Sequence, residues 1–366
     1  MEIILFGLFI LTGIINILYN LSFFSFTSAS SEKSQALNLP VSVIVCAKNE
    51  EENLQNFIPG ILEQNHPDFE LILINDASAD NSLEVMEHFQ NIDPRLKIVN
   101  VQNIEAFWAN KKYALTLGIK KASNKYLLFT DADCVPQSKD WITEMTNHFT
   151  TKEIVLGYGG YFKQKKSLLN KLIRFETLLT AIQYFSYAKL GIPYMGVGRN
   201  LAYTSERFYE LKGFASHLHI KSGDDDLFVN EAANHENTAI CFSENSITRS
   251  VPKKSFSEWT KQKRRHVSTA KQYQQKHRVL LGVYYSARLL FWLLFILLSI
   301  LQIYPIVVLS ILFIKLIFDG IVYYNAAEKL DEKDVIWFYP FLDIFLIFFQ
   351  LAIFSSNLIS KPGQWK

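Results

Sequence analysis

The stretch "KYLLFTDADC", residues 125–134, is an apolar run that ends in two carboxylates one residue apart. The run has the length and composition of a buried β-strand. In an extended chain alternate side chains share a face, so we expect Asp131 and Asp133 to point the same way, where their negative charges repel each other. A divalent cation between them would remove that repulsion. The end of this strand therefore predicts a metal site.

The segments before this strand repeat its pattern and alternate with helical ones. Further strands are predicted at "VSVIVC" (41–46), "ELILIN" (70–75) and "LKIVNV" (96–101), and helices at Glu50–Glu63, Asn81–Gln90 and Lys111–Lys121. Alternating strands and helices favour a parallel sheet with right-handed crossovers. Because the strands are almost continuously apolar, we expect helices on both faces of the sheet. The fold class is therefore α/β.

Polar turns follow three of the four strands, and such sheets bind ligands beyond the carboxyl ends of their strands. The turns are "AKNEE", "NDAS" and "DADC". They should bring together Asn49, Glu50, Asp76, Asp131 and Asp133, which are far apart in the sequence. A single acidic turn also serves as a helix cap, so residues 76–80 could simply cap the next helix along the chain.

The two ends of the chain differ from its charged middle. Of 366 residues 49% are hydrophobic, and the 29 phenylalanines crowd towards both ends. Ile3–Phe26 is almost uncharged and long enough to cross a bilayer. A signal peptide is the alternative, but Glu2 precedes the segment, no Lys or Arg does, and "TSAS" is a weak cleavage site. We therefore expect an uncleaved anchor, and Lys33 after it favours a cytoplasmic location for the α/β domain.

The C-terminal part, 280–358, is richer still in apolar residues. Its first run exceeds one span and contains Pro305, so we expect two helices that meet near 303–305, and a third from Val335 to Leu358. Lys315 and Asp319 are four residues apart and can pair on one helix face. Asp343 has no obvious partner, and we interpret it as an interfacial or bundle-capping residue rather than a functional one.

These observations divide the chain into five parts. They are an N-terminal transmembrane anchor (1–28), a linker (29–39), an α/β domain (40–278), about three C-terminal transmembrane helices (279–360) and a tail (361–366). The net charge of +2 indicates no particular partner, and we expect no nucleic acid. Three cysteines without a CxxC spacing indicate neither a disulfide framework nor a zinc site, and fit reduced cytosolic thiols.

The order and spacing of the motifs resemble a known family. "VSVIVCAKNEE", "LILINDAS", "NKKYAL", "DADC", "GVGRNLAY", "GDDDLF" and "QKRRH" occur in that order between residues 40 and 275. This series resembles family 2 glycosyltransferases with a GT-A fold. The flanking spans look like those of its membrane-bound members, such as cellulose, hyaluronan and poly-N-acetylglucosamine synthases and ceramide glucosyltransferase.

The resemblance implies a site for a nucleoside-diphosphate sugar. Asp131 and Asp133 would form the Asp-x-Asp motif that binds Mg²⁺ or Mn²⁺ together with the donor diphosphate, and such hard cations suit carboxylate oxygens. The remaining donor-side positions that match the family are Ala47, Asn49, Glu50, Asp76 and Lys111. The usual second motif is Asp-Asp-Gly-Ser, and here Asn and Ala replace two of its residues. A UDP-sugar is the expected donor.

The later motifs imply the acceptor side. "GDDDLF" resembles the motif that carries the catalytic base, so we expect Asp225 to be that base, or Asp224 if the alignment shifts by one. Gln262, Arg265 and His266 match the Gln-x-x-Arg-Trp motif, with His in place of Trp, which lowers our expectation of long-polymer synthesis. Arg199 and Asn200 in the glycine-rich loop would contact phosphate or sugar hydroxyls.

The acidic and basic motifs also have interpretations that involve no catalytic role. The acidic run 224–226 could be solvated surface, and a basic patch that includes Lys253, Lys254 and Lys261 could touch anionic lipid. The segment 168–191 is amphipathic and could be an interfacial helix or a core helix.

The sequence thus predicts a membrane-bound glycosyltransferase in the plasma or inner membrane with its catalytic domain in the cytoplasm. It would move a sugar, with inversion, to a lipid-linked or glycan acceptor. A catalytically degenerate nucleotide-sugar-binding subunit of a synthase complex and a sugar-nucleotidyltransferase are the other functions that we considered.

Overall fold

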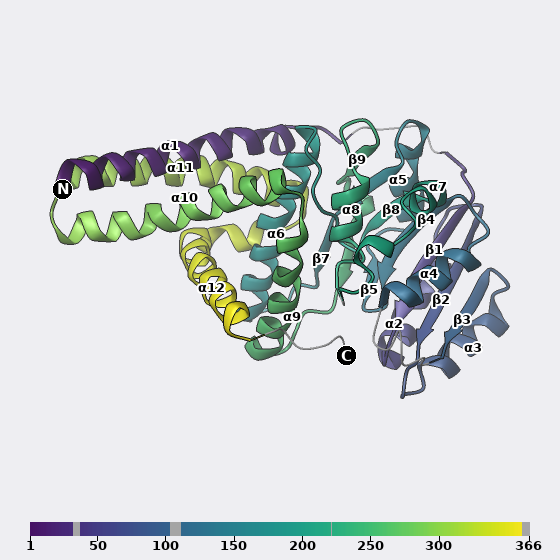
Figure 1. Cartoon of the computed structure of the whole chain (residues 1–366). Helices are drawn as coiled ribbons and strands as arrows, with labels where there is room; N and C mark the ends of the chain where they lie inside the picture. The colour runs from purple at the N-terminus through teal and green to yellow at the C-terminus, as the bar shows by residue number, and fades with distance from the viewer. Residues whose placement is uncertain (32–36, 103–110, 221, 361–366) are drawn as a thin grey trace.

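The structure is a computed structural model that describes residues 1–31, 37–102, 111–220 and 222–360. Residues 32–36 of the predicted linker and all of the predicted tail lie outside the described residues. A group of long helices and an α/β part lie at opposite ends of the molecule (Figure 1). The long helices are α1 (Glu2–Thr27), α10 (Gln275–Ile300), α11 (Pro305–Lys329) and α12 (Tyr339–Ile359), the last preceded by the 3-10 helix η6 (Lys333–Phe338).

A seven-stranded sheet forms the centre of the α/β part, in the order β3-β2-β1-β4-β8-β6-β9. Its strands are β1 (Val41–Ala47), β2 (Phe69–Asp76), β3 (Leu96–Val101), β4 (Tyr126–Asp131), β6 (Ile154–Gly157), β8 (Leu201–Thr204) and β9 (Thr238–Cys241). The strands β1, β2, β3 and β4 pair in parallel, as predicted. β8 is antiparallel to both β4 and β6, so the complete sheet is mostly parallel but mixed.

Alternate residues of the strands enter two separate cores, which confirms that both faces are covered. On one face Val43 and Val45 pack with α2 (Glu51–Leu62), α3 (Ser82–Ile92) and α5 (Trp141–Thr146). On the other face Ile44 packs with α4 (Lys111–Lys121) and α6 (Leu168–Lys189). A strand buried on both faces can have no polar alternation, which explains its continuous apolar sequence.

A small sheet, β5-β10-β7, lies beside the main one. It consists of β5 (Cys134–Pro136), β7 (Gly159–Tyr161) and β10 (Thr248–Ser250). β5 begins directly after the Asp131–Asp133 turn, so this sheet fixes the far side of that turn. Gly160 allows the close approach of β10, because a Cβ there would lie 2.3 Å from Nη1 of Arg249.

Helix α6 lies between the sheet and the long helices (Figure 1). Most of its residues are buried, including Arg174, Phe175 and Phe185, and it contacts α1, α11 and α12. Of the two interpretations of segment 168–191, the structure therefore supports a core helix.

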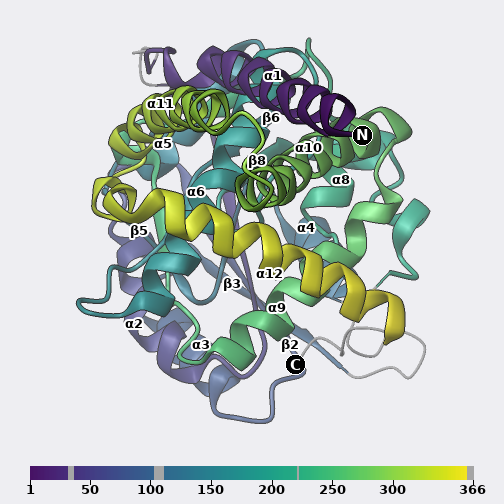
Figure 2. The ribbon, with the colours of Figure 1, turned by 90° about the vertical axis from the view of Figure 1, so that its left-hand side faces the viewer.

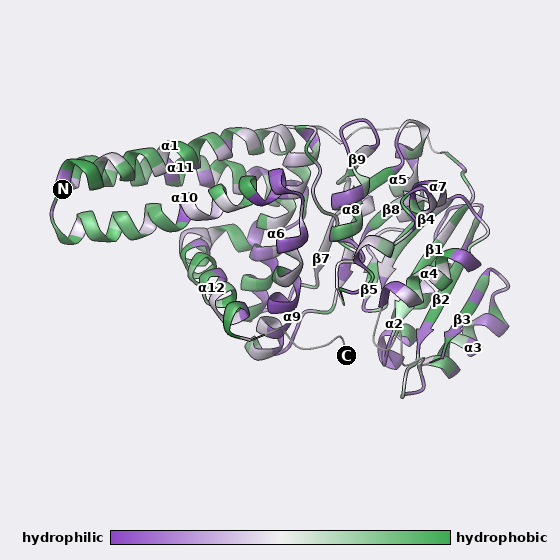
Figure 3. Ribbon diagram, in the orientation of Figure 1, coloured by the Kyte–Doolittle hydropathy of each residue, from purple (hydrophilic) through white to green (hydrophobic). Residues whose placement is uncertain are grey.

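Among the described residues four helices are long and apolar enough to cross a membrane. In Figure 3 the ribbons of these helices are mainly hydrophobic, whereas the α/β part mixes hydrophobic and hydrophilic residues. α10 ends at Ile300 and α11 begins at Pro305, where the break was predicted. The predicted pair of Lys315 and Asp319 is confirmed, at 2.5 Å.

Asp343 of α12 also has a partner, contrary to our expectation. It forms a buried ion pair with Arg288 of α10 and accepts a hydrogen bond from the Tyr323 hydroxyl at 3.3 Å. Arg288 is distant in the sequence, so no local pattern pointed to it. This ion pair attaches α12 to α10.

Candidate active site

The three polar turns lie at one edge of the sheet, as predicted. β1, β2 and β4 are neighbours, and Cys46 is paired with both Ile74 and Asp131. The residues that come after Ala47, Ile74 and Thr130 therefore emerge side by side. Ala47 itself is buried in the core, where its side chain fills space behind the turn.

The turns after β1 and β2 are bonded to each other. The backbone N–H of Asn49 donates to Oγ of Ser78 at 3.0 Å, and its Oδ1 accepts from the N–H of Ala79 at 2.7 Å. Asn49 and Ala77 both have left-handed backbones, with φ of 56° and 50°. Asparagine tolerates this conformation and alanine does not favour it, which explains why glycine is usual in the second motif. Glu50, in the first turn, accepts from Nδ2 of Asn53 at 2.6 Å.

Asp76 ends β2 as a buried carboxylate. Burial raises its pKa, although the nearby Lys48 and Lys111 oppose the shift. Nζ of Lys48 lies 3.8 Å from its Oδ2, which accepts no hydrogen bond from any described residue. A buried oxygen without a hydrogen bond is costly, so Asp76 is unusual among the buried carboxylates of the sheet edge.

Asp131 and Asp133 lie close together, but not for the reason that we gave. β4 ends at Asp131 and a turn carries Asp133, so the two are not alternate residues of one strand. Their carboxylate oxygens and Sγ of Cys134 lie within 4.8 Å of one another. Burial and the charge of Asp131 raise the pKa of Asp133, whereas Lys253 and Arg199 act to lower it.

These residues fit a hard divalent cation. Mg²⁺ and Mn²⁺ prefer oxygen ligands and are commonly held by one or two carboxylates plus substrate phosphates. Cys134 does not belong to that set, because burial holds the pKa of its thiol well above the usual value and Sγ lies 2.7 Å from Oγ of Ser250. The remaining ligands are thus the two carboxylates.

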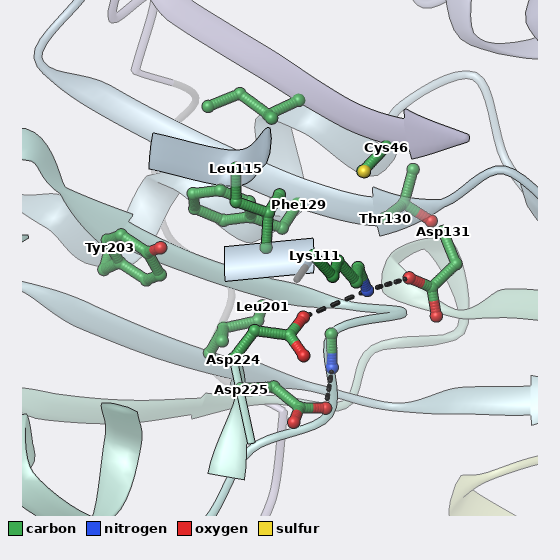
Figure 4. Close-up of a pocket in the computed structure, with 12 residues that line it drawn as sticks. Cys46, Lys111, Leu115, Phe129, Thr130, Asp131, Leu201, Tyr203, Asp224 and Asp225 are labelled. Carbon is green, nitrogen blue, oxygen red and sulfur yellow. Dashed lines mark hydrogen bonds and ion pairs between the residues drawn. The ribbon is translucent and has the colours of Figure 1, made fainter. Parts of the chain in front are cut away.

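Lys111 connects two of the acidic motifs. Its Nζ lies 2.9 Å from Oδ1 of Asp131 and 3.0 Å from Oδ2 of Asp224 (Figure 4). Both carboxylates line one pocket together with Thr130, Gly198 and Asp225. The lysine is buried at the first residue of α4 and lies among the residues of the predicted donor side.

The three carboxylates of the acidic run have different environments. Burial acts against ionisation of Asp224, but Lys111 more than compensates and lowers its pKa. Asp225 caps α8 (Asp226–Ala232), and its Oδ2 accepts from the N–H of Gly198 at 2.7 Å. Burial and the charges of its two neighbours raise the pKa of Asp225 to about 7. The run is therefore a structured part of the pocket wall, not a solvated surface.

Asp226 does more than serve the start of a helix. Its Oδ2 accepts from the hydroxyls of Thr269, at 2.5 Å, and Tyr273, at 2.7 Å. It thus attaches α8 to the end of α9 (Phe256–Thr269).

The glycine-rich loop contributes Arg199 but not the side chain of Asn200. The Arg199 guanidinium lies over the ring of Tyr161 at 4.4 Å and acts on the charges of Asp131 and Asp133. Asn200 is fully buried; its Oδ1 accepts from Trp141, and its Nδ2 donates to the carbonyls of Tyr158 and Ser246. Its amide is satisfied by the protein, so we assign it a structural role instead of the predicted ligand contact.

Helix α9 brings the last motif to the site. Burial lowers the pKa of Arg265, and Asp224, Asp131 and Asp225 act in the opposite direction, so the guanidinium faces the pocket acids. Oε1 of Gln262 is buried and has no hydrogen bond from the described residues. His266, which follows Arg265 in α9, is exposed.

Sequence reasoning missed Lys112. This lysine is buried, and its Nζ donates to the carbonyls of His217 at 2.8 Å and Ile220 at 3.0 Å. It therefore holds the segment that leads into the acidic run. Two adjacent lysines at the start of an amphipathic helix gave a weak signal, because only one is expected to face inwards.

The sheet is mostly parallel, and it carries an Asp-x-Asp turn, an acidic run that caps a helix, and a basic helix. This combination is typical of the class of GT-A glycosyltransferases. Residues 42–205 match the model of the family "Glycosyl transferase family 2". This match covers a little less than half of the chain, and this part of the chain resembles the family.

Curated relatives agree with this class. The chain is 31% identical over 123 residues to an uncharacterized glycosyltransferase of Haemophilus influenzae, which is 34% of this chain and 36% of that protein. It is 26% identical to the putative teichuronic acid biosynthesis glycosyltransferase TuaG of Bacillus subtilis, over 38% of this chain and 54% of that protein. It is 34% identical to a poly-beta-1,6-N-acetyl-D-glucosamine synthase of Staphylococcus epidermidis, over 26% of this chain and 22% of that protein. The matched part is therefore about half or less of each relative.

A solved structure extends the likeness of the fold to most of the chain. The mannosyltransferase PcManGT from Pyrobaculum calidifontis, in complex with GDP-Man and Mn²⁺, superposes with a TM-score of 0.60. The superposition covers 90% of this chain and 98% of that one at 16% sequence identity. At this identity the comparison establishes the fold, including the flanking helices.

Proposed function

We propose that this protein is a membrane-bound glycosyltransferase that transfers a sugar from a nucleoside-diphosphate sugar to a hydroxyl of a lipid-linked or glycan acceptor. The main support is the pocket in which Lys111 joins Asp131 to Asp224 while Asp225 lies beside them, hydrogen-bonded to Gly198. A pocket of this kind offers a cation site, fixed positive charge and a base within one small volume.

Asp131 and Asp133 would hold Mg²⁺ or Mn²⁺. When bound, such an ion neutralises charge that develops on the departing nucleoside diphosphate. Arg199, Arg265 and Lys111 add positive charge around the same position, and guanidinium groups suit phosphate oxygens. The orphaned oxygens of Asp76 and Gln262 are free to bind further polar groups of the donor.

Asp225 is our candidate for the base. As a carboxylate it would take the proton of the acceptor hydroxyl, whose oxygen then bonds to the anomeric carbon as the bond to the diphosphate breaks. Such a single displacement inverts the anomeric configuration. Asp224 suits this role less well, because its ion pair with Lys111 stabilises the charge that a base must give up.

The identities of the donor and of the acceptor are two further proposals. We propose a UDP-sugar as donor, because the turn that carries Asp76 retains the aspartate and serine of the family motif. One relative is a polysaccharide synthase by name, which supports a glycan acceptor, and the apolar helices support a lipid-linked one. In this proposal the catalytic domain faces the cytoplasm, where nucleotide sugars are made.

The assignment of the base is tested by three single variants of the acidic run in the full-length protein. Asp225→Asn should lower transfer by about a hundredfold or more, the usual contribution of a positioned base, and leave metal-dependent donor binding largely intact. Asp224→Asn should weaken donor binding as well, because Lys111 loses a partner. Calorimetry measures donor affinity, and product release from a panel of nucleotide sugars measures transfer.

Asp226→Asn is the structural control. It weakens the bonds to Thr269 and Tyr273, so it should lower the unfolding temperature while the surviving folded protein still transfers sugar. If Asp224→Asn alone abolishes transfer, the base is one residue earlier. Equal and mild effects of all three substitutions would place the base elsewhere.

A further inference from the structure

Helix α12 runs in a different direction from the other three long helices. In Figure 2, α10 and α11 are seen nearly end-on, whereas α12 lies lengthwise across the view. The contacts agree: α1 packs extensively on α10 and α11, whereas α12 packs more on α9 than on any other single element, and less on α10 and α6. Length and composition alone had predicted that α12 crosses the membrane.

Both ends of α12 are attached to the side of the molecule that carries the catalytic domain. Before it, the buried Glu332 forms ion pairs with Arg174 of α6 and Arg249 of β10. At its end, Nε of Arg264 donates to Oδ1 of Asn357, and Nδ2 of Asn357 donates to the Arg264 carbonyl, both at 2.9 Å. A spanning helix would separate its two ends by the thickness of the membrane.

Helix α9 also accompanies α12 along much of its length. The rings of Trp259 and Phe349 stack at 4.6 Å, and Phe256 contacts Phe349 at 5.2 Å. α9 is strongly polar, with the sequence "FSEWTKQKRRHVST". Such a helix is excluded from the hydrocarbon core, because each buried charge there is expensive. The α12 helix beside it therefore cannot lie across that core.

The opposite face of α12 is apolar and exposed. Its outward residues recur every three or four positions and so form one stripe. They are Phe341, Phe348, Leu351 and Leu358, together with Phe345 and Phe354 at the edges of the stripe, whose rings also contact Phe256 of α9 and Tyr285 of α10. With 21 residues α12 is about 31 Å long, so this stripe extends over a wide area. A helix with one apolar face and one face on a polar partner fits the boundary between lipid headgroups and acyl chains.

We infer that α12 lies in the plane of the membrane surface, with this stripe in the lipid, and that the chain crosses the membrane three times, through α1, α10 and α11. The C-terminal end of α12 then remains on the side of the catalytic domain. The inference rests on the membrane association in the proposed function but not on catalysis. It also places α9, which carries Gln262 and Arg265, at the bilayer surface, where a lipid-linked acceptor is presented.

Depth measurements test this orientation directly. A fluorophore is attached to single cysteines at Phe341, Leu351 and Leu358 of the full-length protein in proteoliposomes, and quenched by lipids brominated at different depths. All three positions should give the same shallow depth. Ile306 and Phe313 of α11, which are also exposed, serve as the matched control and should differ in depth. A graded series along α12, like that along α11, would overturn the inference.

Sidedness provides an independent measurement. Cysteines at Ile306, Lys254 and Lys366 are probed with a membrane-impermeant maleimide in sealed cells and again after permeabilisation. Cys46, Cys134 and Cys241 are buried, so the protein without added cysteine gives the background. Lys366→Cys and Lys254→Cys should be labelled under the same condition, and Ile306→Cys under the other one. Labelling of Lys366→Cys together with Ile306→Cys would show a fourth crossing, whatever the protein catalyses.

Discussion

Asp225 gives the site a predicted pH dependence. Its pKa is raised to about 7, and only the deprotonated carboxylate can accept a proton. We therefore expect kcat/KM to rise about tenfold per pH unit below pH 7 and to level off above it. Initial rates between about pH 5 and about pH 9 measure this profile. The residual activity of Asp225→Asn should lack that rise, and a wild-type profile in the variant would contradict our assignment.

The Asp-x-Asp turn predicts dependence on a divalent cation. Asp133→Asn keeps the shape of the side chain but removes a charged ligand, so transfer should fall at least about a hundredfold. Calorimetric titration with Mn²⁺ should show weaker binding in the same variant. Asp68→Asn changes an exposed carboxylate away from the turn and should alter neither quantity. Full activity of Asp133→Asn in the presence of chelator would contradict the metal site.

At the scale of residues, the sequence indicated which side chains belong to the site but not what holds them. The motifs located Asp131, Asp133 and Asp225 because a few spacings suffice to define them. The partners of Lys111 and Asp226 could not be predicted, since they come from elements more than ten positions away. The packing role of Asn200 was equally hidden, because its three partners meet only in the folded chain.

At the scale of elements, the strands and helices with long periodic patterns were predicted closely. β3 and α4 have the expected bounds, and β1, β2 and β4 differ from them by one residue at one or both ends. The antiparallel part was not predicted, because β6 and β8 are only four residues each and show no alternation of their own. Such strands form because they pair with a sheet that already exists.

The segment between α11 and η6 predicts a large effect of one buried charge. Glu332 is fully buried between two arginines and also accepts from the Tyr158 hydroxyl at 3.2 Å. Removing one partner from a buried ion pair typically costs about 3–5 kcal/mol, because it leaves uncompensated charge. Glu332→Ala should therefore lower the thermal unfolding midpoint strongly.

Glu328→Ala is the matched control for that measurement. Glu328 is one helical turn earlier, and its ion pair with Lys333 is exposed on both sides. Exposed pairs contribute little to stability, so this variant should unfold like the wild type. Equal effects of the two substitutions would mean that the Glu332 pairs are not important for the fold.

At the scale of the whole molecule, composition predicted a catalytic domain between membrane helices and the structure has that arrangement. Hydropathy could not give the direction of α12. It measures whether a segment is long and apolar enough to cross, and α12 satisfies both conditions. The direction depends on Arg288, Arg264 and Glu332, which attach the helix from outside its own sequence.

The position of Glu332 also orders the events of synthesis. Arg174 and Arg249 are made early, inside the catalytic domain, but the carboxylate that neutralises them comes after α11. Until the ribosome has delivered that last crossing helix, β10 has an unpaired guanidinium where the finished protein has a buried ion pair. The ion pair that joins β10 to this carboxylate can therefore form only after α11 has been synthesised.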